Sequence, residues 1–178
     1  MWTIGTGAAM LRRPGARDSH PKGATMLSRI LPARVDNRFR GHALALWLFV
    51  PIALMRIAIS LLHIFSADGG AQSVSKVPLD TYPAGAAQNV IALMSRLGLE
   101  QLLLGLIALV VLLRYRALIP LMYLVIVAHY VGHEAIAAMK PLALAGPSGA
   151  STPATVIAAA SVVGLVLSLV GKGYRKRY

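Results

Sequence analysis

Residues 102–122 read LLLGLIALVVLLRYRALIPLM, and this stretch decides the fold. An uncharged apolar run ends at Leu113, two arginines flank Tyr115, and a second apolar run begins at Ala117. A helix of about 20 apolar residues crosses the hydrocarbon core of a bilayer. Both runs extend outward to roughly that length, so they are predicted to be consecutive transmembrane helices joined by a very short basic turn.

Two further apolar runs flank this pair. The predicted transmembrane helices span about 43–66, 86–113, 117–139 and 153–170. The composition agrees, because 57% of the residues are hydrophobic and 13% are charged, whereas a soluble domain averages about 45–50% apolar and about 25% charged residues. The mean hydropathy of +0.66 points the same way. We therefore expect an all-α integral membrane protein built as a four-helix bundle.

The predicted membrane domain covers residues 42–171 and lies between two basic tails. Residues 1–41 are polar, basic and rich in Gly and Pro, which is typical of a disordered tail. Residues 172–178 form a shorter basic tail. The two tails and the turn after Leu113 carry fourteen basic residues, whereas the opposite side carries Lys76 and Lys140. The positive-inside rule then predicts that both termini are cytoplasmic.

The charge and the cysteine count exclude several classes of function. A formal net charge of +12 could indicate nucleic-acid binding, but the basic residues border apolar runs and instead suit a membrane with anionic headgroups. The chain has no cysteine, which excludes disulfides and thiolate chemistry. It also lacks the common nucleophile and nucleotide motifs, so enzymatic activity is not predicted.

The sequence also predicts how the helices begin and pack. Ser151 or Thr152 is expected to cap the fourth helix, with Pro153 at its first position. The second and third helices are expected to form a tight hairpin within a left-handed bundle, because only a short turn joins them. Gly164 lies among small residues at spacing four, which favours close helix packing in lipid.

Seven polar side chains within or beside the apolar runs are the candidate site residues. A charge at mid-bilayer costs about 2.5–3.5 kcal/mol on insertion scales, so such side chains are expected to point into the bundle. Residues spaced four or seven apart share a helix face. The candidates are Arg56, His63, Arg96, Glu100, Tyr130, His133 and Glu134.

Three hypotheses account for these residues. Arg56, Arg96, Glu100 and Glu134 balance in charge, so they could form buried ion pairs that stabilise an accessory or structural subunit of a membrane assembly. Alternatively, a polar cavity in the outer half could bind an anionic lipid, a quinone headgroup or a proton in a small carrier or sensor.

The third hypothesis is a metal or haem site. His129 and His133 have the spacing of helical metal ligands, although HYVGHE lacks the order of the zinc-protease motif. His63 is expected at a similar depth, so haem ligation between helices is geometrically conceivable. Two histidines on one helix more often make hydrogen bonds, so no cofactor is predicted.

The segments DNRFRGHALALWLF at 36–49, VPLDTYP at 77–83 and RYRALIPLMYL at 114–124 carry a resemblance. Together with the four-span layout, they resemble a group of small, uncharacterised bacterial inner-membrane proteins. The resemblance covers about residues 26–170. It implies a four-span topology and a location in the bacterial inner membrane, and it implies no activity or site.

Overall fold

The computed structural model describes residues 26–170, and these residues are entirely helical or irregular. Four of the helices are long and apolar enough to cross a membrane, which confirms the all-α fold with four candidate spans. Residues 1–25 of the predicted tail at 1–41, and the whole of the predicted tail at 172–178, lie outside the described residues. The helices are α1 (Met26–Ile30), α2 (Ala43–Phe65), α3 (Ala84–Arg114), α4 (Ile119–Met139) and α5 (Ser151–Leu169), with 3₁₀ turns η1 (Leu79–Thr81) and η2 (Arg116–Leu118).

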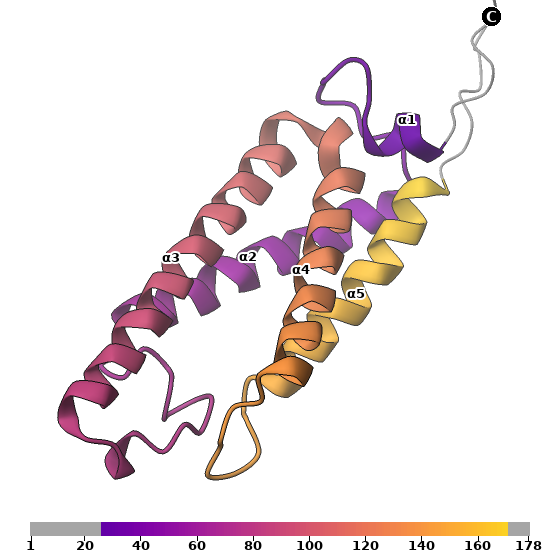
Figure 1. Ribbon diagram of the computed structural model, residues 1–178. Coiled ribbons are helices and arrows are strands. Elements are labelled where there is room, and N and C mark those ends of the chain that lie inside the picture. Colours follow the sequence, from indigo (N-terminus) through magenta and orange to yellow (C-terminus); the bar gives the residue numbers. More distant parts are fainter. Residues whose placement is uncertain (1–25, 171–178) are drawn as a thin grey trace, which may run out of the picture.

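Helix α2 is the central element of the bundle. In Figure 1 it crosses behind α4, from the neighbourhood of α5 at one end of the molecule to α3 at the other. Glycines of α3 allow close approach to α2, since a Cβ on Gly98 would lie 2.8 Å from the Cβ of His63, and one on Gly105 would lie 2.9 Å from Cγ1 of Ile57. Packing between α2 and α3 therefore depends on small residues.

Tyr123 of α4 joins three of the four long helices. Its ring is fully buried and meets Phe49 of α2 edge to face, with ring centroids 5.1 Å apart. Its hydroxyl donates to the carbonyl oxygen of Ala45 on α2 (2.7 Å). On the other side the ring lies directly against Gly164 of α5. The main hydrophobic core surrounds this tyrosine and includes Ile52, Ala53, Ile119, Met122 and Ile126.

We call the end of the bundle near Tyr123 the basic end, because it holds α1 and the Arg114–Arg116 turn. Here backbone hydrogen bonds run from Ala117 to Asp36 and from His42 to Leu167. Arg29 reaches from α1 and donates to the carbonyl oxygen of Leu169 at the end of α5 (2.6 Å), where a cation is favoured by the helix dipole. The chain before α2 is thus attached to both η2 and α5.

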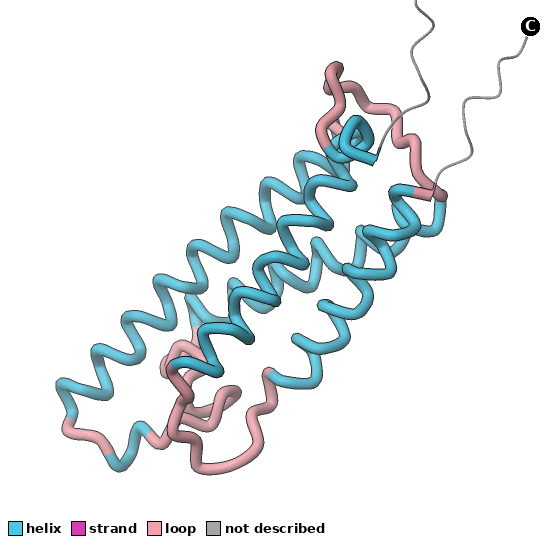
Figure 2. The backbone as a smooth tube through the Cα atoms, turned by 45° about the vertical axis from the view of Figure 1, so that its right-hand side comes forward, coloured by secondary structure: helices cyan, strands magenta, loops and turns pink. Residues whose placement is uncertain are grey.

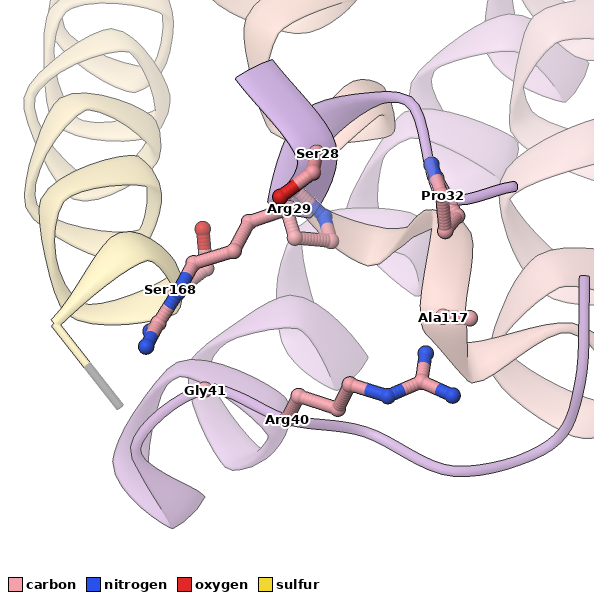
Figure 3. Close-up of a pocket in the computed structure, with 8 residues that line it drawn as sticks. Ser28, Arg29, Pro32, Arg40, Gly41, Ala117 and Ser168 are labelled. Carbon is pink, nitrogen blue, oxygen red and sulfur yellow. The ribbon is translucent and has the colours of Figure 1, made fainter. Parts of the chain in front are cut away.

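A small cavity lies where these segments meet (Figure 3). Its volume of about 20 Å³ is room for about one water molecule. It is therefore a packing gap between α1, α4, α5 and the chain before α2, and it is too small for a metabolite. Its lining residues are Ser28, Arg29, Pro32, Arg40, Gly41, Ala117, Pro120 and Ser168.

The opposite end, which we call the loop end, is closed by two loops that touch each other. The amide of Ala145 donates to the carbonyl of Lys76 (2.8 Å), and the amide of Gly149 donates to that of Val74 (2.9 Å). Between the two ends, α3 and α4 diverge from their short turn (Figures 1 and 2) and make few contacts with each other. The predicted tight hairpin is therefore wrong, because α3 packs on α2 whereas α4 packs mainly on α5.

Two local predictions also differ from the structure. Helix α5 begins at Ser151, and its N-cap is Ala150, so Pro153 lies within the first turn and neither Ser151 nor Thr152 is the cap. The Ser151 hydroxyl instead donates to the carbonyl of Ser148 (2.8 Å). In the predicted disordered tail, residues 26–30 form α1, because Arg29 ties this segment to the end of α5.

We predict that Gly164→Ala destabilises the chain and that Gly132→Ala does not. The added Cβ at position 164 would overlap the Tyr123 ring, whereas nothing lies within 4 Å of a Cβ at position 132. Overpacking of this kind costs about 1–3 kcal/mol, and the control exchange should be neutral or stabilising by up to about 1 kcal/mol because alanine favours helices. Thermal unfolding of both variants in mild detergent checks this, and equal melting temperatures would contradict it.

Candidate intramembrane polar site

Arg56 is the most deeply buried charged residue among the described residues. It lies near the middle of α2, and only 3% of its surface is exposed. Its guanidinium carbon is 5.9 Å from the centroid of the Tyr130 ring, at the outer limit of a cation–π contact. Within residues 26–170, its Nε and Nη2 atoms are buried and have no hydrogen-bond partner.

Helical spacing explains why Arg56 and Tyr130 meet. Arg56 belongs to a stripe of α2 that also contains Phe49, Ala53 and Ser60 and faces the interior. Tyr130 lies seven residues after Tyr123, hence on the same face of α4. The core contact at Tyr123 therefore brings Tyr130 over Arg56 two turns further toward the loop end.

The two histidines of α4 lie beside each other. Their ring centroids are 4.5 Å apart, and His129 is half-buried while His133 is exposed. His129 also meets the ring of Tyr130 edge to face (5.4 Å). Two imidazoles alone leave most positions around a metal unfilled. In the described part of the chain, no group of three or more His, Asp or Glu side chains is arranged so that it could hold a metal ion, so a metal or haem at His129 and His133 stays a hypothesis.

His63 is buried at the end of α2 and fastens the following loop. Its Nδ1 atom donates to the carbonyl oxygen of Gly69 (2.8 Å). Because a carbonyl oxygen only accepts, the Nδ1 atom of His63 carries the proton of this hydrogen bond. Gly69 and Gly70 have φ of +60° and +73°, a conformation that glycine adopts without strain. This turn directs the Gly69 carbonyl at His63.

Asp68 holds the same turn from within. Its carboxylate accepts the backbone N–H groups of Gly70 (2.9 Å), Gln72 (3.0 Å) and Ser73 (2.6 Å), and the hydroxyl of Ser73 (3.1 Å). Burial alone would raise the pKa of this carboxyl, but the hydrogen bonds from Ser73, Gly70 and Gln72 outweigh it and lower the pKa to about 2. An ionised Asp68 thereby keeps the loop in the shape that receives His63.

The remaining candidate residues are not brought together with Arg56. Arg96 and Glu100 on α3, and His133 and Glu134 on α4, are all exposed on the surface of the bundle. The single ion pair found among residues 26–170 joins Arg40 to Asp36, outside the spans. The predicted inward orientation of these four residues is therefore wrong, because α3 turns its glycine face toward α2 and the second half of α4 has few neighbours.

Two important features were not predicted as parts of a site. Tyr123 is uncharged and looked like any aromatic residue of a span, and its role follows only from its contacts with Ala45 and Gly164. The Asp68–Gly70 turn has a local signal, since an aspartate followed by two glycines is typical of a turn with left-handed residues. Its link to His63 depends on the end of α2.

Comparison of the chain with protein-family models, with curated proteins and with solved structures found no match.

We predict that Asp68→Asn lowers the melting temperature at neutral pH. A neutral amide cannot accept all four hydrogen bonds, and the loss should be on the order of 1–2 kcal/mol. Because the folded-state pKa lies below the ordinary value of 3.8, the stabilisation is fully present above about pH 4 and is lost as the pH falls toward 2. The melting temperatures of the natural chain and the variant should therefore converge on acidification.

The matched control is Asp80→Asn, since Asp80 is exposed and takes part in no side-chain hydrogen bond found in residues 26–170. Thermal melts between pH 7 and pH 2.5 in detergent make the measurement. A constant difference between Asp68→Asn and the natural chain across that range would contradict the role given to the carboxylate.

Proposed function

We propose that this chain is an accessory or structural subunit of a bacterial inner-membrane assembly. One observation carries the proposal: charged side chains within the spans are exposed on the surface of the single chain. Arg96 and Glu100 lie one turn apart on α3, and both are exposed. A partner in the membrane would cover them.

The depth of Glu100 makes this observation significant. At 1.5 Å per residue, Glu100 lies about 24 Å from the start of α3 at Ala84 and about 21 Å from its end at Arg114. A hydrocarbon core is about 30 Å thick. When the 31 residues of α3 are centred in this core, Glu100 lies at about the midplane, because it is next to the middle residue of the helix. An exposed carboxylate at that depth faces lipid unless another protein surface covers it, and facing lipid is costly.

Glu134, the charged residue on α4, gives a weaker reason for a partner in the membrane. Glu134 is five residues from the end of α4 at Met139, or about 8 Å along the helix. A side chain at that distance can extend toward the membrane surface. His133 is exposed beside it and need carry no charge. The exposed pair on α3 is therefore the main reason for proposing a partner.

The proposed orientation places the basic end in the cytoplasm, with both termini. The turn Arg114–Arg116 and the segment with Arg34 and Arg38 lie at this end. Basic residues at the cytoplasmic face are favoured by the positive-inside rule and by anionic headgroups. The loops at the other end then face the periplasm.

We predict that Glu100→Gln weakens the assembly without destabilising the isolated chain. Glu100 makes no ion pair or hydrogen bond found in residues 26–170, so melting of the isolated chain should change by less than about 0.5 kcal/mol. In the assembly the change leaves Arg96 without its opposite charge at a buried interface, and retention of partner subunits should fall by about tenfold.

Native mass spectrometry after purification in mild detergent measures the assembly, and Glu134→Gln is the control because its side chain lies near the helix end. The natural chain should run as a complex that Glu100→Gln loses and Glu134→Gln keeps. A natural chain that is monomeric throughout, or a complex indifferent to Glu100→Gln, would overturn the proposal.

A second candidate function, a small carrier or sensor, is favoured by Arg56. Two of its nitrogens are buried without a hydrogen-bond partner in residues 26–170. A buried guanidinium in that state favours an anionic ligand, such as a lipid phosphate or an ionised quinone headgroup. On this hypothesis Arg56 and Tyr130 would hold the ligand between α2 and α4.

For this second candidate, the natural chain should co-purify with an anionic molecule that Arg56→Met loses and Arg56→Lys partly keeps. Mass spectrometry of the intact protein detects the molecule, and a thermal melt reports the fold. A ligand-free natural chain, together with an Arg56→Met variant that melts at or above the natural temperature, would reject the site. The reason is that, without a ligand, Arg56 is an uncompensated buried cation, and its replacement by an apolar side chain of similar length is then neutral or stabilising.

A further inference from the structure

Helix α3 has two opposite faces with the same spacing. The inner face packs on α2 and contains Gly98, Gly105, Ala108 and Leu112. The other face, which we call the outer seam, is exposed along its whole length. Its members are Leu93, Arg96, Glu100, Leu103, Ile107 and Val110.

The outer seam has the geometry of a helix-pairing surface. Its positions alternate in steps of three and four residues, which is the heptad spacing by which two helices interlock at a small crossing angle. From Leu103 toward the basic end it is purely aliphatic, and toward the loop end it carries one cation and one anion. Lipid would satisfy the aliphatic part but not the charged part.

The two charges complement a second copy of the same surface. Copies inserted in the same orientation meet about a two-fold axis along the membrane normal, so their α3 helices run parallel and equal positions lie at equal depth. Arg96 of one copy is then offset from Glu100 of the other by four residues, or about 6 Å along the axis. Extended arginine and glutamate side chains cover that offset. The four side chains would form a ring in which charges alternate in sign.

We propose that the partner that covers the outer seam is a second copy of this chain, paired along α3 by two reciprocal Arg96–Glu100 ion pairs. This inference rests on the proposed function and names the first partner of the assembly. A second copy is favoured over a different protein because the charged part of the seam has zero net charge and complements itself under a two-fold axis.

Disulfide cross-linking of the full chain in membrane vesicles tests the pairing, because the chain has no cysteine of its own. Leu103→Cys places a thiol in the seam, next to the charged ring. Val163→Cys on α5 is the matched control, since Leu103 is 54% and Val163 52% exposed. Mild oxidation should link two copies through position 103 and not through position 163.

Charge reversal then tests the ion pairs in the Leu103→Cys chain. Arg96→Glu alone, or Glu100→Arg alone, places like charges across the seam and should lower the cross-linked fraction by about tenfold or more. The double variant, Arg96→Glu with Glu100→Arg, restores the alternating ring and should restore cross-linking. Mixing the two single variants should also restore it, through mixed pairs. Because the double variant keeps the composition, its recovery separates pairing from failure to fold.

Equal cross-linking at positions 103 and 163, or a yield indifferent to charge reversal, would overturn the pairing. Its failure is distinguishable from failure of the proposed function. A complex that contains other proteins, depends on Glu100 and shows no cross-link at position 103 overturns the second copy but supports a subunit role. A chain that is monomeric in native mass spectrometry and is not cross-linked overturns both.

Discussion

The bundle depends on the packing of Tyr123 between Gly164 and Ala45. In the hydrocarbon core no hydrophobic force separates protein from lipid, so helices associate through close packing and hydrogen bonds. Tyr123 supplies both, because its ring fits against a residue without a side chain and its hydroxyl donates to a backbone carbonyl. Through it α4 is attached to α2 and α5, and the main core is assembled around it.

This contact lies near the basic end, and the rest of the architecture follows from its position. Tyr123, Phe49 and the chain before α2 pack together at the basic end, and α3 and α4 separate from there toward the loop end. Helix α2 changes partners along its length, from the α4–α5 pair to α3, which it meets through Gly98 and Gly105. Near the loop end the helices are held by the two loops, by the Asp68 turn that binds His63, and by a small separate cluster in which Ala71, Val77 and Leu79 pack on α3.

The cost of charge in lipid applies to the surface of the chain as well as to its interior. That cost leads to the expectation that Arg96 and Glu100 point inward, whereas the structure buries Arg56 and leaves the α3 pair outside. A single chain has only one inner face of α3, and that face is occupied by glycines because α2 must approach closely. We propose that the same energetic constraint is met between proteins, because the exposed Arg96 and Glu100 would otherwise face lipid.

The number, length and order of the spanning helices follow from the sequence alone. The length of an apolar run and the turn residues beside it are local properties, and the thickness of the bilayer core sets how long a spanning helix must be. The candidate site was predicted only in part. Arg56 and Tyr130 do come together, as their helical spacing allows, but Arg96, Glu100, His133 and Glu134 do not join them. Which face of each helix is buried was decided only in the tertiary structure. Apolar residues lie on all sides of every span, so hydropathy does not distinguish the faces. The choice depends on where Gly164, Gly98 and Gly105 allow two backbones to meet.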